Sequence, residues 1–70
     1  MRRTLPYLIK VGSKIQATRK AKKLTVRQLA KMCDLDFGNL SRIETGQFNS
    51  KILTLKAIAD SLKVDVKDFF

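Results

Sequence analysis

Apolar residues recur along this chain at intervals of three and four, with polar and charged residues between them. This spacing lines up apolar side chains on one face of an α-helix, and no stretch shows the sustained alternation of a strand. The pattern predicts an all-α domain of five helices. The first helix should span about residues 5–22, because Leu8, Val11 and Ile15 form one stripe and Pro6 is tolerated in a first helical turn.

Two signals for the start of a helix follow, only eleven residues apart. In the first, the Thr25 side chain can accept a hydrogen bond from the N–H of Gln28, whose own side chain can reach back to the N–H of Thr25. In the second, Asp36 is the cap and Asn39 is a shorter and weaker reciprocal partner. An apolar pair can close over each start: Leu24 with Leu29, and Leu35 with Leu40.

These two starts predict a helix-turn-helix. One helix covers about residues 26–33, and its apolar face consists of Val26, Leu29, Ala30 and Cys33. The next covers about residues 37–45 and ends before Gly46, which accepts the left-handed conformation common at helix ends. Residues 34–36 leave room only for a sharp turn.

Two more helices complete the prediction. In the fourth, Leu53 precedes Thr54 and should close over Ile58, as at the earlier starts. Its apolar face is Leu55, Ile58, Ala59 and Leu62. In a short fifth helix, Asp65 is the cap, and Val64 before it should pack on Phe69 across the start of the helix.

Composition limits the kind of protein. The chain has 70 residues, 44% hydrophobic and 30% charged, which indicates one folded domain over 1–70, with 1–6 as an N-terminal arm. It contains no apolar run near the roughly 18 residues of a membrane span and no secretory signal core, so we expect a cytoplasmic protein. Cys33 is the single cysteine and there is no histidine, so we expect no metal, no cofactor and no enzymatic activity.

Charge is distributed unevenly. The formal net charge is +9, yet residues 1–31 contain ten Lys and Arg and no acid, whereas residues 32–70 contain five Lys and Arg and six acids. A basic face of this kind suits nucleic acid or an anionic membrane, and the plain alternative is a solvated helix. Membrane binding is disfavoured, because the apolar stripe of the first helix is better used as core. Nucleic acid is the first choice.

The stretch "LTVRQLAKMCDLDFGNLSRIETG", followed by "TLKAIADSLKV", resembles the Cro and phage-repressor (Xre-type) helix-turn-helix family. The resemblance covers about residues 8–70 and implies a five-helix, lambda-repressor-like fold. It implies a homodimeric regulator that binds an inverted-repeat operator in double-stranded DNA, with the helix at 37–45 in the major groove. It also implies a structural ion pair between Arg19 and Glu44, although Glu44 could instead be a surface residue.

Two positions depart from the family pattern. Polar residues common at the first positions of the two central helices are replaced here by Val26 and Phe37. Either the Phe37 ring, braced by Val26, meets a thymine methyl group, or it folds into the core beside Leu35 and Leu40. A third departure, Asp34 where many relatives have Gly, should preserve the turn, because Asp accepts the left-handed conformation at modest cost.

Base readout is expected from the helix at 37–45, with Arg42 as the strongest candidate for a guanine contact and a phosphate contact as its alternative. The full set is Phe37, Gly38, Asn39, Ser41 and Arg42. Expected phosphate contacts are Thr25, Arg27, Gln47, Asn49, Lys51 and Lys23, although Lys23 could equally be a solvated partner of the helix dipole.

The chain ends in Phe69 and Phe70, which offer more aromatic surface than a short helix can bury alone. We expect one of them to enter the core and the other to contact a partner, so both mark a dimer interface with the fourth helix. No effector domain is evident, so we expect no small-molecule effector. The alternative function is an antitoxin-like module that binds a partner protein, which the lack of a distinct wrapping tail disfavours.

Overall fold

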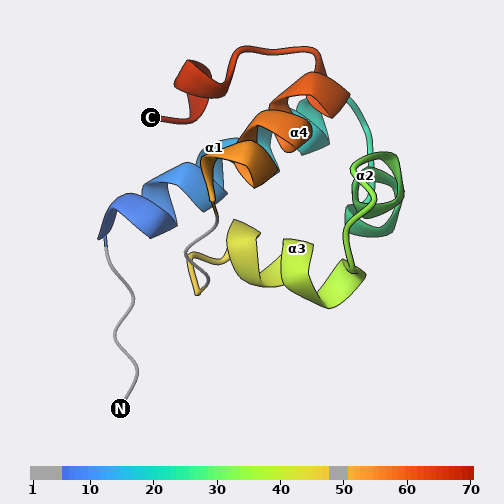
Figure 1. Cartoon of the computed structure of the whole chain (residues 1–70), viewed down its shortest axis with the longest axis horizontal. Coiled ribbons are helices and arrows are strands. Elements are labelled where there is room, and N and C mark those ends of the chain that lie inside the picture. Colours follow the sequence, from blue (N-terminus) through green and yellow to red (C-terminus); the bar gives the residue numbers. More distant parts are fainter. Residues whose placement is uncertain (1–5, 48–50) are drawn as a thin grey trace.

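The computed structural model describes residues 6–47 and 51–70. It contains four α-helices and one short 3₁₀-helix: α1 (Pro6–Ala21), α2 (Val26–Met32), α3 (Phe37–Glu44), α4 (Ile52–Leu62) and η1 (Val66–Phe69). No strand occurs in these two ranges, and the predicted all-α helix-turn-helix fold is confirmed. Figure 1 shows α3 and η1 on opposite sides of the molecule, with α1 and α4 between them. The fifth element is a 3₁₀-helix, because its N–H groups donate to carbonyls three residues earlier, as from Asp68 to Asp65 at 3.0 Å.

The starts of α2 and α3 follow the predicted caps. The N–H of Gln28 donates to Thr25 Oγ1 at 3.1 Å, and the N–H of Thr25 donates to Gln28 Oε1 at 2.8 Å. At α3, Asp36 Oδ2 accepts from the N–H groups of Gly38 and Asn39 at 3.0 and 3.4 Å. The prediction that the Asn39 side chain accepts a hydrogen bond from the N–H of Asp36 is wrong. The short Asn39 side chain instead accepts a hydrogen bond from Arg42 Nη1 at 3.3 Å.

The prediction for the start of α4 is also wrong. The helix begins at Ile52, with Lys51 at the cap position, so Thr54 lies inside the first turn. The N–H of Thr54 donates to the carbonyl of Lys51 at 3.0 Å. Leu53 is 74% exposed and does not cover Ile58, because residues five apart in a helix point in different directions.

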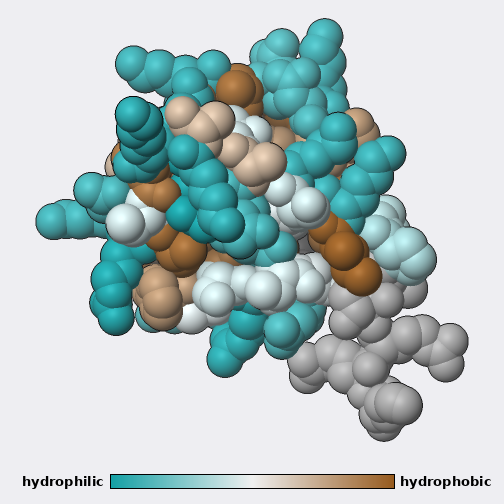
Figure 2. Space-filling view, turned by 180° about the vertical axis from the view of Figure 1, so that it is seen from behind, coloured by the Kyte–Doolittle hydropathy of each residue, from teal (hydrophilic) through white to brown (hydrophobic). Residues whose placement is uncertain are grey.

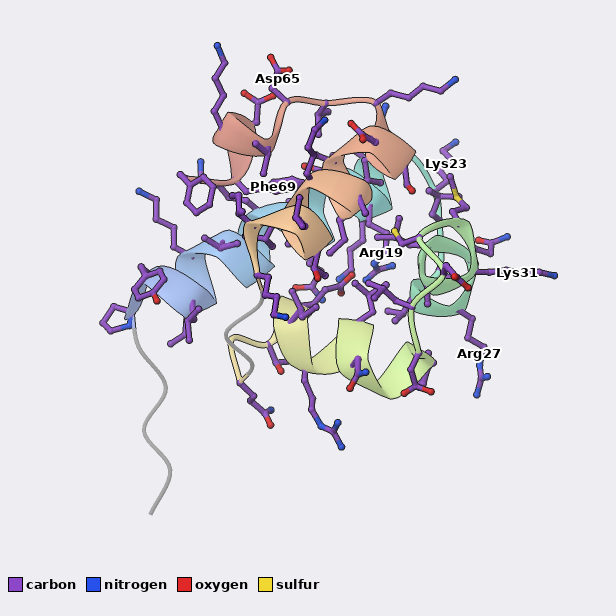
Figure 3. The ribbon with its side chains drawn as sticks, in the orientation of Figure 1. Arg19, Lys23, Arg27, Lys31, Asp65 and Phe69 are labelled. Carbon is purple, nitrogen blue, oxygen red and sulfur yellow. The ribbon has the colours of Figure 1, made fainter. Side chains whose placement is uncertain are left out.

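The core lies where all five elements meet. Its buried apolar residues are Val11, Ile15, Leu29, Ala30, Leu40, Ile43, Leu55, Ile58, Ala59, Leu62 and Phe69. Phe69 reaches this core from η1, which packs against α1 and α4 (Figure 3). The Phe69 side chain is fully buried within one copy of the chain, so Phe69 is the aromatic residue that enters the core, and of the two residues expected at a dimer interface only Phe70 has free surface.

The turn between α2 and α3 depends on one left-handed residue, Asp34, with φ of 58°. This agrees with the expectation that Asp can replace Gly there. Directly before it, the Cys33 thiol donates to Ser61 Oγ on α4 at 3.4 Å. Burial raises the pKa of the Cys33 thiol, and the Ser61 hydroxyl, which can donate to the thiolate, opposes this effect in part. Cys33 therefore helps to pack the turn against α4.

Gly12 sets the distance between α1 and α3. A Cβ atom at this position would lie 2.5 Å from the carbonyl oxygen of Glu44 and even closer to that of Ile43. Real Cβ atoms do not approach carbonyl oxygens so closely, so only glycine allows the two helix backbones to touch here. None of the helices described is long and apolar enough to cross a membrane.

Candidate nucleic-acid interface

One buried arginine connects the helices of the helix-turn-helix. Arg19 Nε lies 2.7 Å from Glu44 Oε2, and Arg19 Nη2 donates to Glu44 Oε1 at 3.1 Å. Arg19 Nη1 also donates to the carbonyl of Leu24, just before α2, at 2.6 Å. Glu44 is therefore not a surface residue. The guanidinium ties α1 to the end of α3 and to the start of α2.

The face of α3 that points away from the core carries polar side chains. Leu40, Ile43 and Glu44 are buried, whereas Arg42 is exposed. Gly38, Asn39 and Ser41 are partly exposed. The hydrogen bond from Arg42 Nη1 to Asn39 Oδ1 steadies one end of the guanidinium. The structure therefore brings the expected base-reading residues together on one accessible surface.

Phe37 does not join the core. It is 44% exposed, and its ring lies beneath the guanidinium of Arg27, with Arg27 Cζ 4.5 Å from the ring centroid. Figure 3 shows Arg27 extending from α2 toward the side on which α3 lies. This pair borders an open hollow whose lining residues are Arg27, Ala30, Lys31, Asp34, Leu35 and Phe37. Val26, expected to brace the ring, is partly buried and packs against the core.

A family model described as helix-turn-helix matches residues 15–69. The chain belongs to this helix-turn-helix family. The immunity repressor protein of Bacillus phage phi105 is 41% identical over 56 residues, which are 80% of this chain and 39% of that repressor. The chain thus spans well under half the length of that relative.

Solved structures support the same assignment. The restriction-modification controller protein C.AhdI from Aeromonas hydrophila matches with a TM-score of 0.88 and 28% identity, over 90% of this chain and 96% of that protein. The wild-type restriction-modification controller protein C.Esp1396I matches with a TM-score of 0.85 and 33% identity, over 94% and 86%. The clp gene regulator ClgR from C. glutamicum shares the fold, with a TM-score of 0.89 at 23% identity, over 99% and 88%.

The residues expected to contact phosphate are more dispersed on this helix-turn-helix protein. Gln47 and Lys51 are exposed close to the two ends of the segment between α3 and α4, and Asn49 lies outside the described residues. Thr25 is exposed, with its hydroxyl oxygen already accepting a hydrogen bond in the cap of α2. Lys23 lies on the far side of α2 from α3 (Figure 3), so the structure does not bring it close to α3.

Apolar side chains are also exposed away from α3. Figure 2 shows the face opposite that of Figure 1, where hydrophobic patches are separated by hydrophilic side chains. Apart from Phe37 on α3, the large exposed apolar residues are Tyr7, Ile9, Met32, Ile52, Leu53 and Phe70. Phe70 is 56% exposed and, unlike Phe69, has surface available for a partner.

Sequence reasoning missed two features of this family member. It did not pair Arg27 with Phe37. The signal for this contact was an arginine and an aromatic residue in the first turns of two adjoining helices. It also missed the close approach at Gly12, for which a glycine within a predicted helix was the only sign.

Proposed function

We propose that this chain is the DNA-binding domain of a transcriptional regulator and reads operator sequences in the major groove with α3. The observation that carries the proposal is the exposed polar face of α3, which is held in place from behind by the buried pair of Arg19 and Glu44. Membership of the helix-turn-helix family supports it, as does similarity to a phage immunity repressor and to restriction-modification controllers.

Arg42 is the central residue for base readout in this proposal. Its guanidinium can donate two hydrogen bonds to O6 and N7 of a guanine. The bond to Asn39 Oδ1 limits its rotation before DNA arrives, and Asn39 retains amide donors for a neighbouring base. Ser41 adds a hydroxyl group, and Gly38 lets the backbone of α3 approach the base edges closely.

Binding strength comes from charge in this proposal. The net charge of +9 attracts the phosphate backbone at long range. Lys51 and Gln47, close to the two ends of the segment that follows α3, are placed to contact phosphates beside the groove. Such contacts set the position of α3 on the duplex without choosing its sequence.

The operator should contain two inverted half-sites, because a homodimer with two-fold symmetry presents two copies of α3 about one helical turn apart. Phe70 supplies exposed aromatic surface for this dimer, next to a fully buried neighbour that anchors its backbone. The match covers 39% of the phage immunity repressor, and the proposal applies equally to this domain within a longer regulator.

The test is selection of duplexes from a random pool, followed by titration of the winning and a scrambled duplex at two salt concentrations. The proteins are the wild type, Arg42→Ala and, as a control for charge, Lys67→Ala. Lys67 is exposed on η1, which Figure 1 places on the opposite side of the molecule from α3.

The expected result is a paired inverted motif in which Arg42→Ala relaxes the preference at one guanine and costs about 1–3 kcal/mol. Lys67→Ala should keep both the motif and the affinity to within a small factor. Binding that is equal for both duplexes and depends only on salt would contradict sequence-specific recognition.

A further inference from the structure

A second candidate for base readout lies beside α3 and involves α2. Arg27 is the second residue of α2 and Phe37 is the first residue of α3, ten positions later. The tight turn between the helices places Arg27 Cζ 4.5 Å from the centroid of the Phe37 ring. Both side chains are exposed, so the stack is a surface feature and not a part of the core.

The surrounding structure fixes both members of the stack. Asp36 caps α3 and so sets the backbone from which the Phe37 ring projects. The mutual bonds of Thr25 and Gln28 fix the first turn of α2, which carries Arg27. Because Leu40 fills the core below α3, the Phe37 ring remains at the edge of the core, against the guanidinium.

Stacking leaves the useful part of the guanidinium accessible. An aromatic ring attracts the flat face of the guanidinium. The five N–H donors of the guanidinium lie in the plane of that group and point outward from it. The result is a row of donors beside an apolar ring edge. The separation of 4.5 Å is comparable with the rise of about 3.4 Å between neighbouring base pairs. Two neighbouring bases can therefore meet the two groups.

The chemistry of the major groove offers one matching pair of bases. Guanine presents the O6 and N7 acceptors that suit a guanidinium fork, and thymine presents a methyl group that suits an apolar ring. We propose that Arg27 and Phe37 form one reading unit for a 5-methylpyrimidine next to a guanine, in which Arg27 binds the guanine and Phe37 contacts the methyl group. This inference rests on the proposed function and replaces the phosphate contact first expected of Arg27.

A phosphate contact by Arg27 would behave differently. A phosphate accepts hydrogen bonds from any cation, so lysine could replace arginine there with little loss, and the ring would contribute nothing. A guanine contact contributes only at duplexes that contain that guanine, and a variant without donors at position 27 should no longer respond to a change of its N7 acceptor. The two possibilities are therefore separable by comparing the same DNA changes in the wild type and in a variant that lacks the guanidinium.

The first test changes the DNA and keeps the wild-type protein. In the selected operator, 7-deazaguanine replaces one guanine at a time and removes only N7, and uracil replaces the neighbouring thymine and removes only its methyl group. At the step read by Arg27 and Phe37, the first change should weaken binding about tenfold. The second should weaken it about threefold, as expected for the loss of one buried methyl group.

The second test changes the pair. Arg27→Met, which has no donor, should abolish the effect of 7-deazaguanine at this step, and Phe37→Ser, which removes the apolar ring, should abolish the effect of uracil. Arg42→Ala should retain both effects, because it acts at a different guanine, and Lys67→Ala is again the charge control. Circular dichroism establishes that each variant is folded, as expected for substitutions at exposed positions.

Three outcomes are distinguishable. Loss of the two DNA effects in the matching variants supports the reading unit. Weaker binding to every duplex with unchanged 7-deazaguanine sensitivity in Arg27→Met would overturn it and assign Arg27 to phosphate, while the proposed function would stand on the retained sequence preference. Absence of any preferred duplex would refute the proposed function, and the inference with it.

Discussion

Replacing Arg19 with methionine should destabilise the domain by roughly 3–5 kcal/mol, the usual cost of removing one partner from a buried ion pair. The side chains of Arg19 and Glu44 are only 8% and 4% exposed. Methionine fills a similar volume, but it leaves the Glu44 carboxylate buried without its counter-charge. It also removes the donor to the carbonyl of Leu24, which Arg19 Nη1 contacts at 2.6 Å.

The size of the effect matters for so small a protein. At roughly 0.05–0.15 kcal/mol per residue, a 70-residue domain has a free energy of unfolding of only about 4–10 kcal/mol. Loss of 3–5 kcal/mol would therefore bring Arg19→Met near the unfolding threshold. The double variant Arg19→Met/Glu44→Met should lose less than the sum of the two single changes, because it leaves no charge buried alone.

Urea denaturation of the wild type, both single variants and the double variant at constant pH and salt measures these differences. Equal denaturant slopes would establish that only stability has changed. A loss of about 1 kcal/mol or less in Arg19→Met would refute the reasoning, since exposed ion pairs contribute that little. Strict additivity of the two single changes would also contradict a direct interaction between the charges.

Three further predictions concern other parts of the fold. Gly12→Ala should destabilise by about 1–3 kcal/mol in thermal unfolding, because its methyl group would collide with backbone carbonyls of α3. Gly38→Ala should cost less, because its Cβ would meet only the Asp36 side chain, 3.1 Å from Oδ2. Thr25→Ala should lower the free energy of unfolding, measured by urea denaturation, by about 1 kcal/mol, because the N–H of Gln28 loses its acceptor. A change near zero would show that this cap does not stabilise the domain. Phe70→Glu should shift the mass seen by light scattering from dimer to monomer with little change in melting temperature, and a variant that remains dimeric would exclude this residue from the interface.

Local signals in the sequence were sufficient to place α2 and α3. The caps at Thr25 and Asp36 involve partners within three residues, so the sequence contains the whole interaction. The same holds for Asp65 at the start of η1, where the N–H of Asp65 donates to Asp68 Oδ2. The helical spacing of apolar and polar positions likewise identified Arg42 as an exposed residue of α3.

Predictions failed where several local choices were nearly equal. Thr54 is a better cap residue than Lys51, yet α4 begins after Lys51, where no side-chain bond caps the helix. The start is therefore set by packing of the later apolar residues and not by a local bond. The two terminal aromatic residues posed the same difficulty, and only the packing of η1 on α1 and α4 decides that Phe69 is the buried one.

The candidate site was predicted residue by residue, but not as an arrangement. The stack of Arg27 on Phe37 depends on the angle between α2 and α3, which one sequence does not specify. The ion pair of Arg19 with Glu44 joins residues 25 positions apart and was expected only from the resemblance. Contacts of this kind require knowledge of how whole helices pack.

The three hydrogen bonds of Arg19 have a consequence for the thermodynamics of association. Through one guanidinium, the end of α3 and the entry to α2 are held in a fixed relation before any duplex is present. A surface that is already ordered loses little conformational entropy when it docks, so more of its contact energy is retained as affinity. A variant that keeps the contacts with DNA but loosens this link would bind with a larger entropic penalty, although no residue that touches the duplex had changed.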